Sequence, residues 1–158
     1  MYCESNLDFT LQLRPDEFSL AIQKNILDRL NKKLLYEYFE DKGKVVEVQH
    51  VNNIKQMPLV SSGNAEFKVN VSVALFQVEK GNTVLGTVTR VNKLGFYMDE
   101  THHQMYLPFH YLSHYIFDKD HYAKEKSIIQ VGTKLHVKVI GTRYSPQDAK
   151  FHSIIDLA

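Results

Sequence analysis

The stretch GNAEFKVNVSVALFQVEKGNTVLGTV, residues 63–88, has the alternation of a β-strand and then changes phase. Apolar side chains occupy the odd positions from Ala65 to Leu75, and polar ones occupy the even positions from Glu66 to Ser72. A period of two predicts a strand with one buried face. Apolar residues then move to even positions, at Ala74, Phe76 and Val78. We therefore predict a long strand that is buried first on one face and then on the other.

The residues before this stretch predict a small α+β unit. Residues 7–13 alternate as a strand, and Pro15 ends it. Asp16 and Glu17 suit the first turn of a helix, because carboxylates are favoured at the positive end of the helix dipole. The apolar stripe of this helix would consist of Phe18, Ile22, Ile26, Leu30 and Leu34. Gly43 suits a turn, residues 45–51 predict a second strand, and residues 52–64 predict an irregular loop.

The second half of the chain predicts short strands rather than helices. We expect strands over residues 83–91, 96–99, 104–107, 135–139 and 151–157, with a turn at 93–95. Residues 108–117 suit one or two helical turns, and the charged segment 118–127 suits a surface insertion. Five short strands with a short helical piece between the third and fourth are typical of the OB barrel. Such barrels often bind single-stranded nucleic acid.

Composition limits the possible functions. The chain is long enough for one medium domain or two small ones, and no apolar run is long enough for a membrane helix. The polar N-terminus does not resemble a secretory signal, and the single Cys3 fits a reducing compartment. Positions 1–80 contain 10 basic and 11 acidic side chains, whereas positions 81–158 contain 9 and 7. Any nucleic-acid surface should therefore lie in the second half, and its binding should be weak and sensitive to salt.

Two segments carry a family resemblance. GNTVLGTVTRVNKLGFYMDE, followed by MYLPFHYL, resembles the RNA-binding OB domain repeated in the largest small-subunit ribosomal protein. In this chain the segment LDFTLQLRPDEF, an amphipathic helix, the 63–88 stretch and this domain follow one another. The same order of segments occurs in another family. That family is the stalk-forming seventh subunit of RNA polymerase II, with archaeal and polymerase III counterparts. The similarity to this family covers nearly the whole chain.

The resemblance implies a non-catalytic subunit of α+β class with two domains. Residues 1–79 would form a tip domain that docks on the polymerase core near the clamp base. Residues 80–158 would form a five-stranded OB barrel that meets nascent single-stranded RNA and transcription factors. Expected partners are the largest subunit, small core subunits and a fourth-subunit-type stalk protein, with no membrane and no cofactor. The location would be the nucleus, or the cytoplasm or virion for a viral homologue.

The resemblance assigns one set of contact residues in the first half, and the change of phase in residues 63–88 assigns another. The tip loop corresponds to residues 54–64, which makes Met57, Pro58 and Leu59 the candidates for core docking. Met57 and Leu59 have a second interpretation, because they would equally suit the edge of this domain's own core. The phase change at Ala74, Phe76 and Val78 would join the two domains. The chain departs from the family at Gln56, where relatives tend to have Gly.

The candidate RNA contacts combine aromatic and basic side chains. Tyr97 and Tyr106 lie on the two central predicted strands, where rings can stack on bases. Alternation puts Phe96 inside the barrel and Tyr97 outside, although a half-buried tyrosine is also ordinary without RNA. The possible phosphate contacts are Arg90, Lys93, Lys138, Arg143 and Lys150. Pro108 stands where ribosomal-type domains often have His, so that contact position differs.

Histidines suggest an alternative class, a metal hydrolase. His110 and His114 are four positions apart, and His102, His103 and His121 are near them in sequence. HYLSH lacks the Glu that follows the first His in the HExxH motif, so we expect solvated surface histidines and no metal site. No phosphate loop, Ser-His-Asp motif or paired carboxylates support catalysis. A further alternative is a free-standing single-stranded RNA-binding protein in translation or RNA decay.

Overall fold

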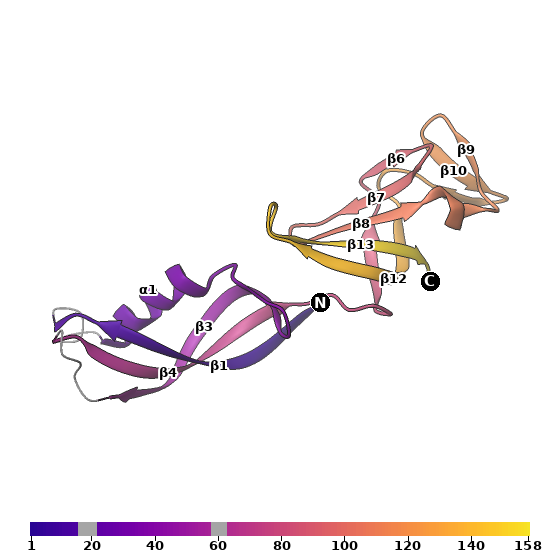
Figure 1. The fold of residues 1–158 in the computed structure, drawn as a ribbon. Helices are drawn as coiled ribbons and strands as arrows, with labels where there is room; N and C mark the ends of the chain where they lie inside the picture. The colour runs from indigo at the N-terminus through magenta and orange to yellow at the C-terminus, as the bar shows by residue number, and fades with distance from the viewer. Residues whose placement is uncertain (16–21, 58–62) are drawn as a thin grey trace. The chain divides into compact units, whose positions relative to one another are not determined.

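A computed structural model describes residues 1–15, 22–57 and 63–158. Their contacts divide the chain into two compact units, Met1–Gln77 and Val78–Ala158, which we call the first and second units. Both consist mostly of β-strands, and the described residues contain one α-helix (Figure 1). Within these residues, no helix is long and apolar enough to span a membrane.

The first unit is an antiparallel sheet with a helix on one face (Figure 1). Its elements are β1 (Tyr2–Leu13), α1 (Ile22–Leu34), β2 (Tyr38–Phe39), β3 (Gly43–Gln56) and β4 (Ala65–Phe76). The strand order is β1-β4-β3-β2, so the strand that the opening stretch predicts lies inside the sheet. It pairs with β1 over its whole length, from Leu13 opposite Ala65 to Tyr2 opposite Phe76.

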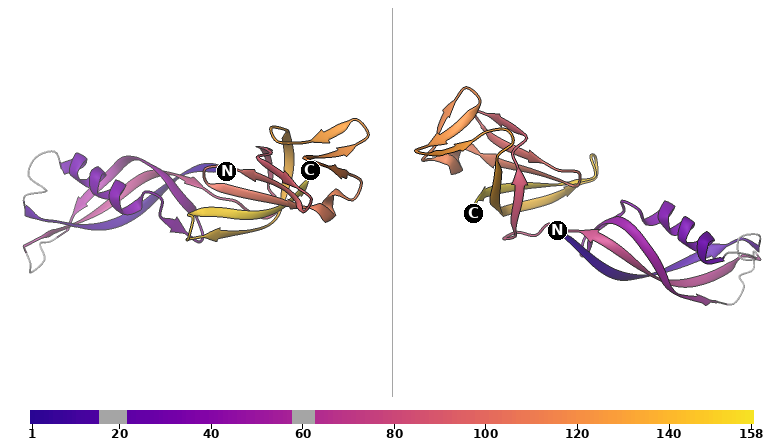
Figure 2. Two further views of the ribbon diagram at one scale, coloured as in Figure 1. Left: turned by 90° about the horizontal axis from the view of Figure 1, so that it is seen from above. Right: turned by 180° about the vertical axis from the view of Figure 1, so that it is seen from behind.

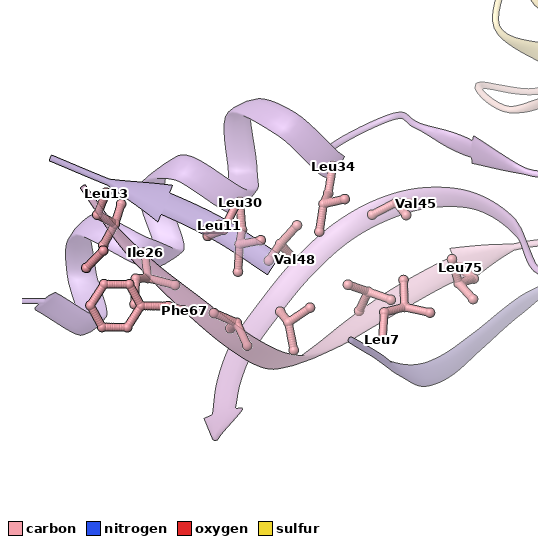
Figure 3. Close-up of a cluster of buried hydrophobic side chains, with 14 residues drawn as sticks. Leu7, Leu11, Leu13, Ile26, Leu30, Leu34, Val45, Val48, Phe67 and Leu75 are labelled. Atoms are coloured by element: carbon pink, nitrogen blue, oxygen red, sulfur yellow. The ribbon is translucent and has the colours of Figure 1, made fainter. Parts of the chain in front are cut away.

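The core of the first unit lies between the helix and the odd-numbered side of β4. Ala65, Leu75 and the odd positions between them are buried, as the alternation predicts. Ile26, Leu30 and Leu34 of the predicted helix stripe are buried against them (Figure 3). Ile22 is partly buried in the same cluster, and Phe18 lies outside the described residues. Full burial of each such aliphatic side chain stabilises the fold by about 1.5–3 kcal/mol.

The prediction of an irregular loop over residues 52–64 is wrong for residues 52–56. Strand β3 continues to Gln56, where it pairs with Phe67 of β4. The register of β3 shifts between Val45 and Glu47, between Val48 and His50, and between Val51 and Asn53. Each extra residue reverses the side of the sheet on which the following side chains lie, so the strand has no continuous period of two. This loss of alternation made the end of β3 resemble a loop in the sequence.

The phase change after Ala74 is visible in the burial of β4. Ala74 is half-buried and lies opposite Glu4 and Glu47, whereas Phe76 is buried on the even side. The ring centroid of Phe76 lies 5.0 Å from that of Tyr2. Val78 is also buried and begins the second unit. A role of these residues in joining two domains stays a prediction.

The second unit contains a six-stranded sheet in the order β5-β12-β13-β8-β7-β6. Its strands are β5 (Thr83–Thr87), β6 (Arg90–Asn92), β7 (Gly95–Asp99), β8 (His103–Pro108), β12 (Lys134–Ser145) and β13 (Lys150–Leu157). The two outer strands, β5 and β6, are consecutive in the chain and are separated only by Val88 and Thr89. The single strand expected over residues 83–91 is therefore two short strands at opposite ends of the sheet order. The N–H of Val88 donates to Thr133 O, and that of Thr89 donates to Tyr97 O.

The segment after β8 is more regular than its charged sequence suggested. The 3₁₀ helix η2 (Phe109–Leu112) confirms the short helical piece, and three strands follow it. These strands are β9 (Ile116–Asp118), β10 (His121–Lys124) and β11 (Ser127–Ile129), which form a separate sheet (Figure 2). Tyr122 of β10 is only 3% exposed, and its ring centroid lies 5.2 Å from that of Phe117. The insertion therefore has an aromatic cluster of its own, which a charged surface loop would lack.

Candidate nucleic-acid interface

Alternation along β7 and β8 decides which side chains face outward. Phe96 is fully buried and Tyr97 is half-exposed, as predicted. On β8, Met105 and Leu107 are fully buried, while Tyr106 is half-exposed. A glycine is required at the start of β7, because Gly95 has a φ of +142° and an added Cβ would overlap Leu107 O. The turn before β7 is thus packed closely against the end of β8.

A row of outward-facing residues crosses five strands of the sheet. Register pairs join Arg90 to Tyr97, Tyr97 to Tyr106, Tyr106 to Ile154, and Ile154 to Gly141. The guanidinium carbon of Arg90 lies 4.0 Å from the centroid of the Tyr97 ring. The ring centroids of Tyr97 and Tyr106 are 4.7 Å apart, and the rings are inclined at 30°. The row therefore places a cation and two aromatic rings side by side.

A second row of polar side chains runs beside the first. Gln104 pairs with His152, and His152 pairs with Arg143. His152 Nε2 lies 2.6 Å from a carboxylate oxygen of Asp148. Desolvation raises the pKa of Asp148, but the hydrogen bond and charge of His152, together with hydrogen bonds from Lys150 and Ser145, lower that pKa overall. This contact holds the imidazole at the edge of the sheet next to Arg143.

The two rows enclose a pocket of about 380 Å³, which we call the platform pocket. Its walls include Tyr97, Tyr106, Arg143 and His152, and Gly141 lies among its lining residues. A Cβ added at Gly141 would meet no atom within 4 Å, so the absence of a side chain there keeps the pocket open. The volume is within the range of small-molecule sites, about 300–1,000 Å³. Aromatic rings beside a guanidinium suit a nucleobase and its phosphate.

A hydrogen-bond chain connects the buried His103 with Ser153 and Thr142, two residues that line this pocket. His103 Nε2 is 2.7 Å from Ser153 Oγ, and the Ser153 hydroxyl donates to Thr142 Oγ1 over 2.9 Å. Which of His103 Nε2 and Ser153 Oγ donates depends on the tautomer of the imidazole. His103 is 1% exposed, and burial lowers its pKa to about 4, with a smaller effect from nearby His152. The imidazole is therefore a neutral part of the fold, and the expectation that it is solvated is wrong.

The structure groups some predicted contact residues and separates others. Tyr97, Tyr106 and Arg143 line the platform pocket, and Arg90 stacks on Tyr97. Lys93 lines a different pocket beside η2, and Lys138 lines a third with Lys80 and Asp156. Lys150 begins β13 opposite Ser145. RNA contact by all seven positions remains a prediction.

The sequence interpretation missed several side chains of the platform pocket. His152 and Ile154 occupy even positions in a segment correctly predicted as a strand, so alternation alone would have placed them outside. Alternation along β8 would likewise have placed Gln104 on the outer side of the sheet. Gly141 was not detectable in this way, because it follows a register shift between Val139 and Gly141 that the residue pattern does not reveal. The partner strand of β8 was also hidden, because its pairing with β13 is parallel and long-range.

The histidines do not form a recognisable metal centre within the described residues, where no three His, Cys, Asp or Glu side chains gather suitably. His110 and His114 are exposed around the end of η2. His103 is committed to Ser153, and His121 Nδ1 lies 3.1 Å from Asp120 Oδ1.

The candidates for core docking are only partly described by the structure. Met57 is half-buried, and its N–H donates to Glu66 O over 2.8 Å. Pro58 and Leu59 lie outside the described residues. Docking through these three positions therefore stays a prediction.

Known proteins match both halves of the chain. Residues 77–148 match the S1 RNA binding domain family. The fission yeast Schizosaccharomyces pombe DNA-directed RNA polymerase II subunit rpb7 is 28% identical over an alignment 149 residues long, which covers 87% of this chain and 84% of that protein. The resemblance to the seventh-subunit family is confirmed.

Two plant relatives show the same extent of similarity. DNA-directed RNA polymerase II subunit RPB7 of Glycine max and subunit 7 of Arabidopsis thaliana are each 25% identical over 150 residues. In both cases the alignment covers 90% of this chain and 85% of the relative. Similarity to the seventh-subunit family therefore extends over the first unit as well as the second.

Proposed function

We propose that this chain is a non-catalytic stalk subunit of a multisubunit DNA-directed RNA polymerase. One observation carries the proposal: the seventh-subunit relatives align with 87–90% of the chain, across both compact units. An RNA-binding domain alone would account only for residues 77–148. The first unit lies almost entirely before that domain in the sequence. The similarity to polymerase subunits also accounts for the presence of this first unit.

The second unit would contact nascent single-stranded RNA through the platform pocket of a five-stranded OB barrel. In that interpretation β5 and β6 are the two halves of the first barrel strand, since they are consecutive and lie at the two ends of the sheet order. Arg90 covers one face of Tyr97, so Tyr106 is the better candidate for stacking on a base. Arg143 and His152 would then lie near the phosphate. The small net charge of +1 makes the affinity modest and salt-dependent.

The first unit would act as the tip domain. Met57, together with Pro58 and Leu59, would dock on the core near the clamp base, where the largest subunit and small core subunits are the expected partners. Ala74, Phe76 and Val78 would fix the direction in which the second domain projects. A fourth-subunit-type protein is the expected stalk partner. The nucleus is the proposed location, with the cytoplasm or virion as the alternative for a viral chain.

Co-purification tests the polymerase assignment. A tagged full chain should bring down the large polymerase subunits in stoichiometric amounts from its own cells, identified by mass spectrometry. A Leu85→Ala variant is a suitable control, because Leu85 is 55% exposed on β5 and lies outside the residues proposed for docking. Recovery of the chain without any large polymerase subunit, from extracts in which the polymerase stays assembled, would refute the assignment.

A free-standing RNA-binding protein is the second candidate, favoured by the match of the S1 domain family alone. It predicts that the second unit suffices for function in the cell when the first is deleted. The stalk assignment predicts the opposite, because the second unit would lose its docking domain. A complementation assay with residues 78–158 therefore separates the two, provided that this fragment is folded by circular dichroism.

A further inference from the structure

A second aromatic pocket, of about 480 Å³, lies where the β6–β7 turn meets the inserted strands. We call it the insertion pocket, and the residues that the argument uses are Lys93, Phe109, His110, Tyr115, Phe117 and Tyr122. Aromatic rings and a lysine thus occur together, and none of the described residues that line the pocket is Asp or Glu. The platform pocket has the same chemistry, with Arg143 in place of the lysine.

The insertion pocket has a fixed base and an open edge. Tyr122 is buried, and its hydroxyl donates to Asn92 O over 2.6 Å, which ties β10 to the β6–β7 turn. Burial raises the pKa of this hydroxyl, so it stays protonated as a donor. Phe109, by contrast, is 55% exposed at the start of η2. A large apolar ring held in solvent beside a pocket is suited to stacking on a flat partner.

One turn separates the two pockets. The Tyr106 hydroxyl of the platform pocket donates to Leu94 O over 2.8 Å. The N–H of Phe109 donates to the same carbonyl over 2.9 Å. Lys93, the residue before Leu94, lines the insertion pocket. A single strand that leaves Tyr106 in the direction of this turn would therefore pass both Lys93 and the exposed ring of Phe109.

We infer that the insertion pocket binds a further nucleobase of the same single-stranded RNA, with Lys93 contacting the phosphate between the two sites. The inference rests on the proposed RNA contact of the platform pocket and extends it to the three inserted strands. The charge of the pocket lining favours RNA over an apolar peptide as the occupant. Aromatic rings can stack on the flat bases, and a lysine without a neighbouring carboxylate in the lining attracts the negatively charged backbone. The insertion would lengthen the RNA footprint of the domain.

Oligouridine binding by the full chain tests this inference by length. Fluorescence anisotropy would use labelled strands of about 4 and about 12 nucleotides, the range of site sizes for one OB fold. Phe109→Ala should weaken binding of the longer strand about fivefold or more, as expected for one lost stack, and leave the shorter strand almost unaffected. Ile116→Ala is the matched control, since Ile116 is 74% exposed on β9 and does not line the pocket. Lys93→Ala should also reduce the salt dependence for the longer strand.

Each result bears on a different part of the inference. Equal affinity of Phe109→Ala and wild type for the longer strand would overturn it, and loss of binding in Tyr106→Ala would show that the platform contact still stands. Unchanged RNA affinity with reduced recovery of polymerase subunits by Phe109→Ala would identify the pocket as a protein-docking site instead. Failure of the wild-type chain to bind either strand would refute the RNA contact of both pockets together.

Discussion

Replacing His103 with Gln should remove a pH dependence from the stability of the second unit. The wild-type imidazole has a pKa of about 4 in the fold, against 6.5 when unperturbed. Between these values the unfolded chain binds a proton that the folded chain excludes, so stability falls as pH falls from 6.5 to about 4. At about 1.4 kcal/mol per pH unit, this difference corresponds to about 3 kcal/mol. Above 6.5 both states are neutral, and the contribution is constant.

Glutamine suits this substitution because its side-chain amide can donate to Ser153 without titrating. Hydrogen exchange, corrected for the intrinsic pH dependence of exchange, should report opening of β8 and β13 in both proteins at several pH values. The difference between wild type and His103→Gln should grow by about 3 kcal/mol between about pH 7 and pH 4. Exchange in β4 of the first unit is the internal control. Carboxylates that titrate near pH 4 affect both proteins equally and cancel in the difference.

A titration by NMR gives a direct check of the same reasoning. The His103 resonance can be assigned by its loss in His103→Gln among the eight histidines of the chain. A midpoint near pH 6.5 for that resonance, or parallel stability profiles of the two proteins, would refute the argument from burial. The buried Ser153 would then have to tolerate a charged imidazole at 2.7 Å from its Oγ.

Four further substitutions test packing and the platform pocket. Gly95→Ala should destabilise the second unit by about 3 kcal/mol or more in thermal unfolding, because its Cβ would overlap Leu107 O. Gly132→Ala has only the penalty of a positive φ and should cost about 1 kcal/mol, so equal losses would contradict the steric argument. Leu30→Ala should cost the first unit about 2–5 kcal/mol, measured by urea unfolding, and a loss below about 1 kcal/mol would refute its placement in the core. Gly141→Phe should fill the platform pocket and weaken oligouridine binding while the melting temperature stays near wild type; undiminished binding would place the base elsewhere.

The sequence predicted those features that depend on local periodicity. The odd-numbered face of β4, the stripe of α1 and the opposite orientations of Phe96 and Tyr97 all follow from the periods of a strand and a helix. The same logic located Tyr97 and Tyr106 on neighbouring strands. The family resemblance then predicted that both units together correspond to a seventh-subunit protein. The aligned relatives agree with this prediction.

Features that depend on register needed the tertiary structure. The shifts in β3 and β12 insert single residues that no side-chain pattern marks, so the end of β3 and the position of Gly141 were not predictable. The parallel pairing of β8 with β13 brings Ile154 beside Tyr106, although the two are far apart in sequence, and it buries His103. Periodicity determines which side of a strand a residue occupies. Only the pairing of distant strands decides which residues share that side, and the platform pocket is formed by that pairing.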